Sequence, residues 1–125
     1  MYIQEEAEFL LEITKNHDLN NFPNNRQLQN AVSMVLIKIG ESVKSLSEEL
    51  KQENQEIEWR DIAGLRDIAV HNYKGLRMDD IWRIVTRDVP KLLGQVEKIL
   101  YAENGVNEHY NKQRNFFIIK NKIFS

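Results

Sequence analysis

Cysteine is absent from this chain of 125 residues. Its absence excludes disulfide bonds, thiolate nucleophiles and cysteine-ligated zinc sites, and it is typical of a cytoplasmic protein. The sequence also has no apolar run of the roughly 18 residues that a membrane span needs, and no charged-then-apolar leader. We therefore expect neither a membrane-spanning helix nor a secretory signal.

Neither acidic nor basic side chains are in large excess, and the net charge is −2. Because a protein that coats nucleic acid needs a large positive charge, this balance argues against that class. Residues 1–59 hold 5 basic and 11 acidic side chains, whereas residues 60–91 hold 7 and 5. This asymmetry would steer a phosphate chain to one part of the molecule, or it reflects ordinary solvated helix faces. The length and the hydrophobic content of 42% indicate one soluble globular domain.

Apolar residues recur at spacings of three and four along most of the chain, which is the period of amphipathic helices. The pattern is clearest over residues 26–52, where it predicts one helix of about 40 Å. It predicts three further helices, over residues 2–13, over 59–73, and from 78 to about 100. No strand-like alternation occurs before residue 115. We therefore predict an all-α fold, an antiparallel four-helix bundle.

Two features modify this bundle. Pro90 lies inside the fourth apolar pattern and must kink or divide the helix, because it lacks an amide and crowds the preceding turn.

After a polar stretch, Phe116 begins four consecutive bulky apolar residues that need burial on the bundle or on a second chain. We divide the chain into a helical bundle, residues 1–102, and an extra C-terminal tail, residues 103–125.

Residues 66–73, Arg-Asp-Ile-Ala-Val-His-Asn-Tyr, carry the chemistry of the chain. Arg66 can stabilise charge on a phosphorane and His71 can move protons near neutrality, a minimum set for metal-free RNA cleavage. Five positions on a regular helix separate the two side chains by about 140°, whereas Arg66 and Tyr73 lie within about 20° of one face. Either the helix unwinds near His71, or a second copy of the chain supplies half of the site. We predict the second, in a twofold dimer.

The same residues also have purely structural interpretations. His71 would suit a helix C-terminus, Arg66 an ion pair within or between helices, and Tyr73 the core with its hydroxyl at the surface. Trp59 and Trp82 fall on the apolar stripes, and we interpret both as core residues. Two further histidines, at positions 17 and 109, have no second ligand at metal spacing, so we expect no metal site and no cofactor.

The segment resembles the signature of the HepT toxins, a branch of the HEPN superfamily, because Arg66, His71 and Tyr73 stand in the spacing R-x4-H-x-Y. Its surroundings are similar too, over about residues 26 to 100. They include Ile-Gly-Glu at 39–41, Leu-Ser-Glu-Glu-Leu at 46–50, Ile-Glu-Trp-Arg-Asp-Ile-Ala-Gly-Leu-Arg at 57–66, Ile-Trp at 81–82 and Asp-Val-Pro-Lys-Leu at 88–92. This ordered series is far more specific than R-x4-H alone.

The resemblance implies an all-α homodimer that acts as a metal-independent endoribonuclease in a type VII toxin–antitoxin pair. Its partner would be an MntA-like minimal nucleotidyltransferase, which silences the toxin by transferring AMP from ATP to the motif's tyrosine. By position, Arg66 and His71 become the catalytic pair, Asp67 and Asn72 support them, and Tyr73 is the AMP acceptor. RNA would be the substrate, and DNA would not be cut because it lacks the 2′-hydroxyl nucleophile.

Three hypotheses follow for the function. The first is the dimeric ribonuclease toxin. The second is a non-catalytic HEPN subunit that binds a nucleotidyltransferase and presents Tyr73 or a substrate to it. The third is a purely structural dimerising bundle. The joint presence of Arg66, His71 and Tyr73 favours the first over the third, and an RNA-cleavage assay separates the first from the second.

Overall fold

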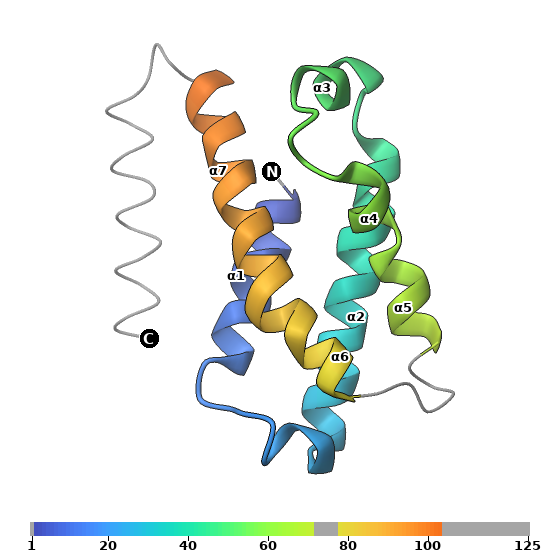
Figure 1. Ribbon diagram of the computed structural model, residues 1–125, viewed down its shortest axis with the longest axis vertical. Helices are drawn as coiled ribbons and strands as arrows, with labels where there is room; N and C mark the ends of the chain where they lie inside the picture. The colour runs from blue at the N-terminus through green and yellow to red at the C-terminus, as the bar shows by residue number, and fades with distance from the viewer. Residues whose placement is uncertain (1, 72–77, 104–125) are drawn as a thin grey trace.

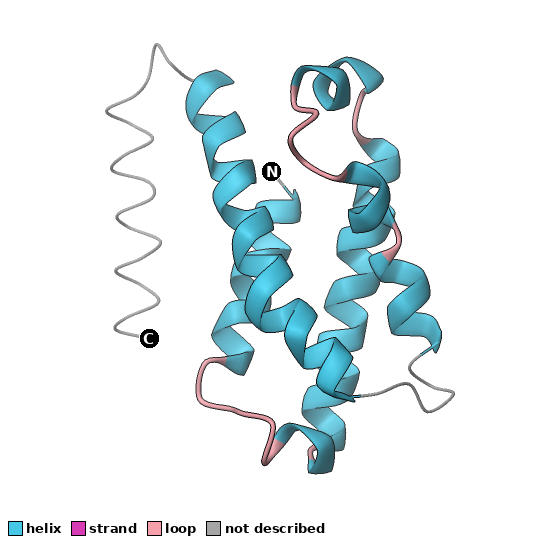
Figure 2. Ribbon diagram, in the orientation of Figure 1, coloured by secondary structure: helices cyan, strands magenta, loops and turns pink. Residues whose placement is uncertain are grey.

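The computed structural model describes residues 2–71 and 78–103, and these form helices joined by short turns, with no strand among them (Figure 1 and Figure 2). In chain order the elements are α1 (Tyr2–Thr14), the 3-10 turn η1 (Phe22–Asn24), α2 (Arg26–Ser42), the 3-10 turn η2 (Val43–Ser45), α3 (Glu48–Glu53), α4 (Trp59–Ala63), α5 (Leu65–His71), α6 (Met78–Arg83), the π turn η4 (Ile84–Asp88) and α7 (Val89–Glu103). The predicted all-α fold is confirmed. Of the expected tail, residues 103–125, Glu103 ends α7, and residues 104–125 lie outside the described residues.

The helices run alternately up and down the long axis of the molecule (Figure 1). α2 packs against α1 on one side and against α5 on the other, and α1 also packs against α7. This arrangement is the antiparallel bundle that the helical periodicity predicts. None of the helices in the described part of the chain is both long and apolar enough to cross a membrane.

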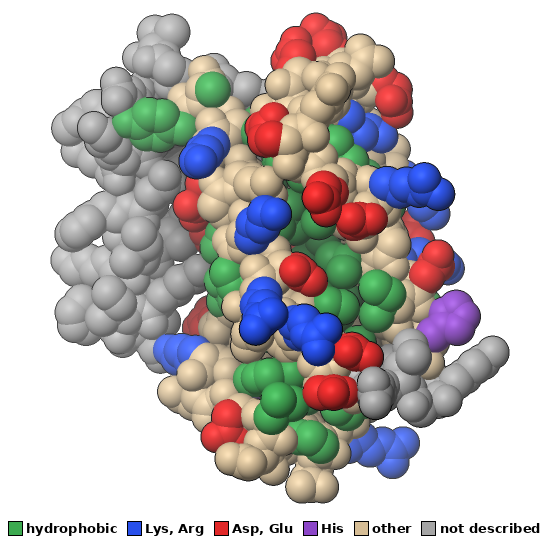
Figure 3. Space-filling model, in the orientation of Figure 1, with side chains coloured by type: hydrophobic (Ala, Val, Ile, Leu, Met, Phe, Trp, Pro, Cys, Tyr) green, Lys and Arg blue, Asp and Glu red, His purple; other side chains and the backbone are tan. Residues whose placement is uncertain are grey.

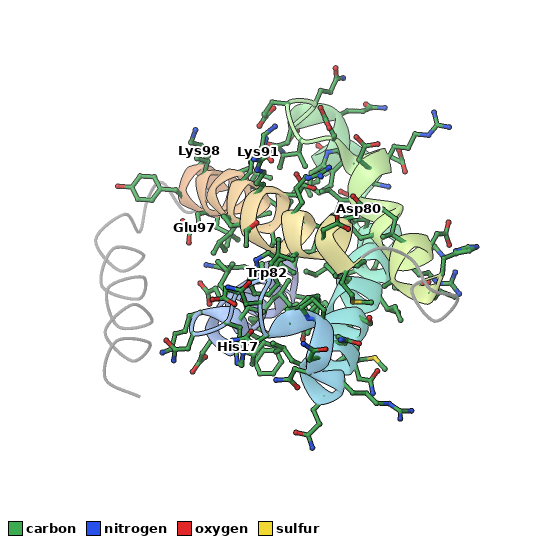
Figure 4. All side chains as sticks on the ribbon, turned by 60° about the horizontal axis from the view of Figure 1, so that its bottom comes forward. His17, Asp80, Trp82, Lys91, Glu97 and Lys98 are labelled. Carbon is green, nitrogen blue, oxygen red and sulfur yellow. The ribbon has the colours of Figure 1, made fainter. Side chains whose placement is uncertain are left out.

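The core is built from the apolar stripes of the helices, as the sequence periodicity predicts. Its largest fully buried side chains are Phe22, Ile3, Leu10, Leu36, Ile39, Ile57, Ile81, Leu92, Val32, Val85, Val89 and Val96. Each such side chain contributes about 1.5–3 kcal/mol through its removal from water. Trp82 packs against Phe22, with ring centroids 4.8 Å apart. Figure 4 shows Trp82 among the side chains between the helices, whereas Lys91 and Lys98 project away from α7.

The helix predicted over residues 26–52 is divided in the structure, so that prediction was too long. α2 ends at Ser42, where the chain tightens into η2, and Leu46 is extended with φ −78° and ψ 144°. Hydroxyl groups compete with the helical hydrogen-bond ladder here, since Ser42 Oγ donates to the carbonyl of Ile39 at 2.7 Å. Ser47 then caps α3 by accepting from the amide of Leu50 at 3.1 Å.

The third predicted helix begins at Trp59 as expected but contains a break at Gly64, which separates α4 from α5. Trp59 is half-buried, and its indole N–H donates to the carbonyls of Lys51 at 3.2 Å and Asn54 at 3.1 Å. This contact ties the start of α4 to α3. The predicted end of the helix, at residue 73, lies outside the described residues. Both tryptophans are therefore structural residues, as we interpreted them from the sequence.

Pro90 affects the fourth helix through the turn that precedes it. α6 and α7 are joined by the π turn η4, in which the amide of Val89 donates to the carbonyl of Ile84, five residues earlier. A wider turn relieves the clash between a proline ring and the carbonyl four residues before it. The hydroxyl of Thr86 donates to the carbonyl of Trp82 at 2.9 Å within the same region. The prediction of a kink or division at Pro90 is confirmed in this form.

A groove of about 550 Å³ lies between the α4–α5 segment and the η4–α7 segment. Its apolar lining includes Ile62, Leu65, Ile68, Ile84 and Leu92. Figure 3 shows this hollow, with apolar side chains at its floor and charged groups of both signs around it. Because the groove separates α5 from η4 and α7, the position of α5 depends mainly on its packing against α2.

Candidate active site

The candidate catalytic residues lie on α5, which holds Arg66 in its first turn and His71 at its end. α5 is anchored by two buried apolar residues, Leu65 and Ala69, on the face that meets α2. Both Arg66 and His71 are exposed. The helix stays regular from Leu65 to His71, so the two side chains leave it about 140° apart. The structure therefore does not bring them together on one α5.

Arg66 is held by two carboxylates. Its Nε donates to Glu41 of α2, and its Nη1 lies 3.2 Å from Oδ1 of Asp67. The Arg66 side chain remains 45% exposed in spite of these contacts. A guanidinium has five N–H donors, and neither contact uses Nη2. Arg66 thus forms an ion pair between helices, as its purely structural interpretation predicts. It also keeps N–H donors that could bind a phosphate.

Gly40 explains how α2 comes so close to the start of α5. A Cβ atom at this position would lie 2.7 Å from the amide nitrogen of Arg66 and 2.9 Å from the carbonyl oxygen of Ala63. Only a residue without a side chain allows two backbones to approach in this way. Gly40 therefore sets the distance over which the next residue, Glu41, reaches the guanidinium.

His71 is oriented by the backbone of its own helix. Its Nδ1 lies 2.7 Å from the carbonyl oxygen of Asp67, one turn earlier. Since a carbonyl only accepts, Nδ1 carries a proton in this contact. In the neutral ring Nε2 is then the nitrogen with the free lone pair, which a general base requires. Asp67 therefore contacts both candidates, Arg66 through its carboxylate and His71 through its carbonyl.

Asn72 and Tyr73, the predicted supporting residue and modification site, lie outside the described residues. The described part of α5 also exposes two apolar side chains, Ile68 at 38% and Val70 at 40%. Apolar groups at these positions, interleaved with Arg66 and His71, are the kind of surface that a second chain covers.

No group of three or more histidine, aspartate or glutamate side chains within residues 2–71 and 78–103 has the geometry to hold a metal ion. His17 is half-buried in the turn after α1, and its Nδ1 is a buried atom without a hydrogen-bond partner. The other histidine outside the motif, at position 109, is not among the described residues. The arrangement on α5 offers a cation and an imidazole, which suit proton transfer beside a phosphate.

Sequence reasoning did not assign Glu41 or Gly40 to the site. It counted both among the residues that resemble the HepT family, in Ile-Gly-Glu at 39–41. In the structure Glu41 also pairs with Lys44, at 3.2 Å. A usable signal was the glycine inside a strongly periodic helix. Such a glycine weakens the helix, and it usually marks the close approach of another backbone.

A helical bundle that exposes Arg and His at R-x4-H spacing on one short helix has the features of the HEPN class. The chain belongs to the family described as "Ribonuclease HepT-like", whose model matches residues 3–99. The resemblance of the chain to HepT proteins is therefore confirmed.

Similar proteins come from bacteria and archaea. The chain is 35% identical over 102 residues to a "Putative RNase" of Caldanaerobacter subterraneus subsp. tengcongensis, an alignment that covers 82% of this chain and 91% of the relative. It is 36% identical over 95 residues to a "Putative RNase" of Methanocaldococcus jannaschii, covering 76% and 87%. It is 34% identical over 97 residues to the "Probable ribonuclease HepT" of Thermococcus cleftensis, covering 78% and 88%. No solved structure gives a significant match.

Proposed function

We propose that this protein is a metal-independent endoribonuclease toxin whose active site is assembled from the α5 segments of two chains. The observation that carries the proposal is the exposed pair on α5, Arg66 and His71, each oriented through Asp67. Membership of the HepT-like family and the ribonuclease names of the relatives support the same reaction.

The chemistry follows from the two side chains. Nε2 of His71 takes the proton of an RNA 2′-hydroxyl, whose oxygen attacks the adjacent phosphorus. The 5′-oxygen leaves with a proton from the second subunit's imidazole, and the product ends in a 2′,3′-cyclic phosphate. Arg66 binds the scissile phosphate through the donors that its carboxylate partners do not use, and stabilises the charge of the transition state.

The helical geometry supports a dimer. Two groups that leave one helix about 140° apart cannot both face one phosphate, but a twofold axis can set the Arg66 of one chain near the His71 of the other. Ile68 and Val70 are exposed on α5 and would lose that exposure in such an interface. The site is incomplete in a single chain.

Regulation by a partner completes the proposal. A minimal nucleotidyltransferase of the MntA type would transfer AMP from ATP to the hydroxyl of Tyr73, with release of pyrophosphate. The choice of Tyr73 rests on its place in the R-x4-H-x-Y spacing of the sequence. The added bulk and negative charge would repel RNA from the guanidinium. This modification would make the pair a toxin and its antitoxin.

An RNA-cleavage assay tests the reaction. Purified chain with EDTA should cut single-stranded RNA, leave DNA of the same sequence intact, and produce cyclic phosphate ends. Arg66→Ala and His71→Ala should each lower the rate by at least about 100-fold. Lys98→Ala is the control, because Lys98 projects from α7 away from the bundle (Figure 4).

Three outcomes contradict the proposal in different ways. If His71→Ala cuts RNA as fast as the wild type, the role assigned to His71 is wrong. A chain that light scattering shows to be monomeric at micromolar concentration, with full activity, excludes the composite site. A chain that is AMPylated on Tyr73 but never cuts RNA is the non-catalytic subunit instead.

A further inference from the structure

The direction of α5 is set by other parts of the bundle. The described part of α5, Leu65–His71, has seven residues and follows the break at Gly64. A single helical segment of this length is not stable in water, so tertiary contacts must fix its direction. The contacts with α2 supply most of that packing, and Gly40 makes them close. The orientation of Arg66 therefore depends on α2.

Glu41 is the α2 residue that reaches the guanidinium itself. Its carboxylate contacts Arg66 Nε on one side and Lys44 Nζ, at 3.2 Å, on the other. Lys44 lies in η2, the turn that follows α2, so its contact holds the carboxylate close to the end of α2. Arg66 receives this contact from α2 and a second one from Asp67 of its own helix. Two carboxylates on different elements restrict a side chain that would otherwise sample many rotamers.

From this geometry we infer that Glu41 is a positioning residue for the ribonuclease reaction, which aims Arg66 so that Nη2 faces the scissile phosphate. The inference rests on the proposed function. It separates Glu41 from the catalytic pair, since the carboxylate acts only through Arg66 and does not touch RNA.

The solvent exposure of the Glu41–Arg66 ion pair distinguishes a positioning role of Glu41 from a merely structural one. The side chains of Glu41 and Arg66 are 41% and 45% exposed, and ion pairs with this much solvent contact add little to folding stability. Loss of the carboxylate should thus leave the fold intact. It should instead allow Arg66 to leave the orientation that the transition state requires, and a displacement of about 1 Å can cost about 100-fold in rate.

The test compares Glu41→Ala and Glu41→Gln with the wild type. Glu48→Gln is the matched control, because Glu48 is an exposed glutamate in a similar pair with Lys51, at 3.0 Å, but on α3. With single-stranded RNA as substrate, we expect kcat of Glu41→Ala to fall about 10- to 100-fold while KM changes by less than about threefold. Glu41→Gln keeps an oxygen that accepts from Nε and should recover part of the loss. Equal rates for Glu41→Ala and Glu48→Gln would overturn the inference.

A double mutant decides whether Glu41 acts through Arg66. In an Arg66→Ala background, Glu41→Ala should cause no further loss, since no guanidinium is left to position. A further loss of tenfold or more would mean that the carboxylate acts independently, which contradicts the inference. Thermal melting of each variant checks that the folded fraction is unchanged, so that a lower rate is not a loss of structure.

Two measurements separate this inference from the proposed function. The Nε–H signal of Arg66 in ¹⁵N NMR should exchange faster with water in Glu41→Ala than in the wild type, whether or not RNA is cut. If the wild type does not cut RNA, the proposed reaction fails. Faster exchange in Glu41→Ala would still show that Glu41 restrains the guanidinium of Arg66. Unchanged exchange overturns the inference.

Discussion

Replacement of Gly40 by alanine tests the closest backbone contact of the candidate site. The new Cβ would lie 2.7 Å from the amide nitrogen of Arg66, and ordinary contacts between such atoms begin near about 3.5 Å. The start of α5 must therefore move away from α2 by about 0.8 Å. Overpacking of this kind costs about 1–3 kcal/mol. Alanine also favours the helix by about 0.8–1.0 kcal/mol over glycine, which offsets part of that cost.

Gly94 provides the matched control, because it lies inside α7 and a Cβ there meets no atom within 4 Å. Gly94→Ala should thus gain the full helical preference, about 0.8–1.0 kcal/mol of stability. The helical preference is common to both substitutions and cancels in their comparison. We therefore expect Gly40→Ala to be less stable than Gly94→Ala by about 1–3 kcal/mol, the overpacking cost alone.

Urea unfolding followed by circular dichroism measures the free energy of unfolding of both variants. Both are compared at the same chain concentration, because dimerisation would add to the apparent stability. A difference of 1 kcal/mol corresponds to about 4 °C in Tm for a chain of 125 residues. Gly40→Ala should also cut RNA more slowly than its folded fraction explains, since it displaces Arg66. If Gly40→Ala stabilises the protein as much as Gly94→Ala does, α5 does not depend on this contact.

Substitutions at three further positions test the fold. Trp59→Phe removes the N–H that donates to two carbonyls at the end of α3, and should cost about 0.5–1.5 kcal/mol in urea unfolding. Asn25→Ala removes the side-chain cap of α2 and should cost about 0.5–2 kcal/mol, whereas Asn25→Asp should cost little; equal losses would argue against the cap. Leu36→Ala leaves a cavity at a fully buried position and should cost about 2–5 kcal/mol, so a loss below 1 kcal/mol would mean that Leu36 is not in the core.

The bundle itself could be predicted from the sequence because helical periodicity reports which faces are buried. The burial of Trp82 follows directly from the apolar stripe. The break between α2 and α3 could not be predicted in the same way. Leu46 and Leu50 keep the spacing of the stripe across it and still pack against the core. Periodicity therefore continues through a turn whose cause is the local competition of serine hydroxyls.

The candidate site could be predicted only in part, because some of its residues share one helix and one comes from a helix much earlier in the chain. Arg66 and His71 are five residues apart, so helix geometry alone indicates that they diverge. Glu41 is 25 residues before Arg66, and its contact depends on the register of α2 against α5. No single-helix argument fixes that register. The packing of a glycine against a backbone fixes it, and that contact appears only when the two helices are placed together.

Adjacent positions of α2 contribute to the site in opposite ways. Gly40 supplies no side chain and so permits the approach of α5, and Glu41 supplies a charge that is useful only at that approach. A larger residue at position 40 would move the guanidinium away from Glu41, and an uncharged residue at 41 would leave a well-packed α5 whose Arg66 is held only by Asp67 among the contacts described above. The two positions are therefore coupled, and the effect of Glu41→Ala on cleavage should be smaller in a Gly40→Ala background than in the wild type.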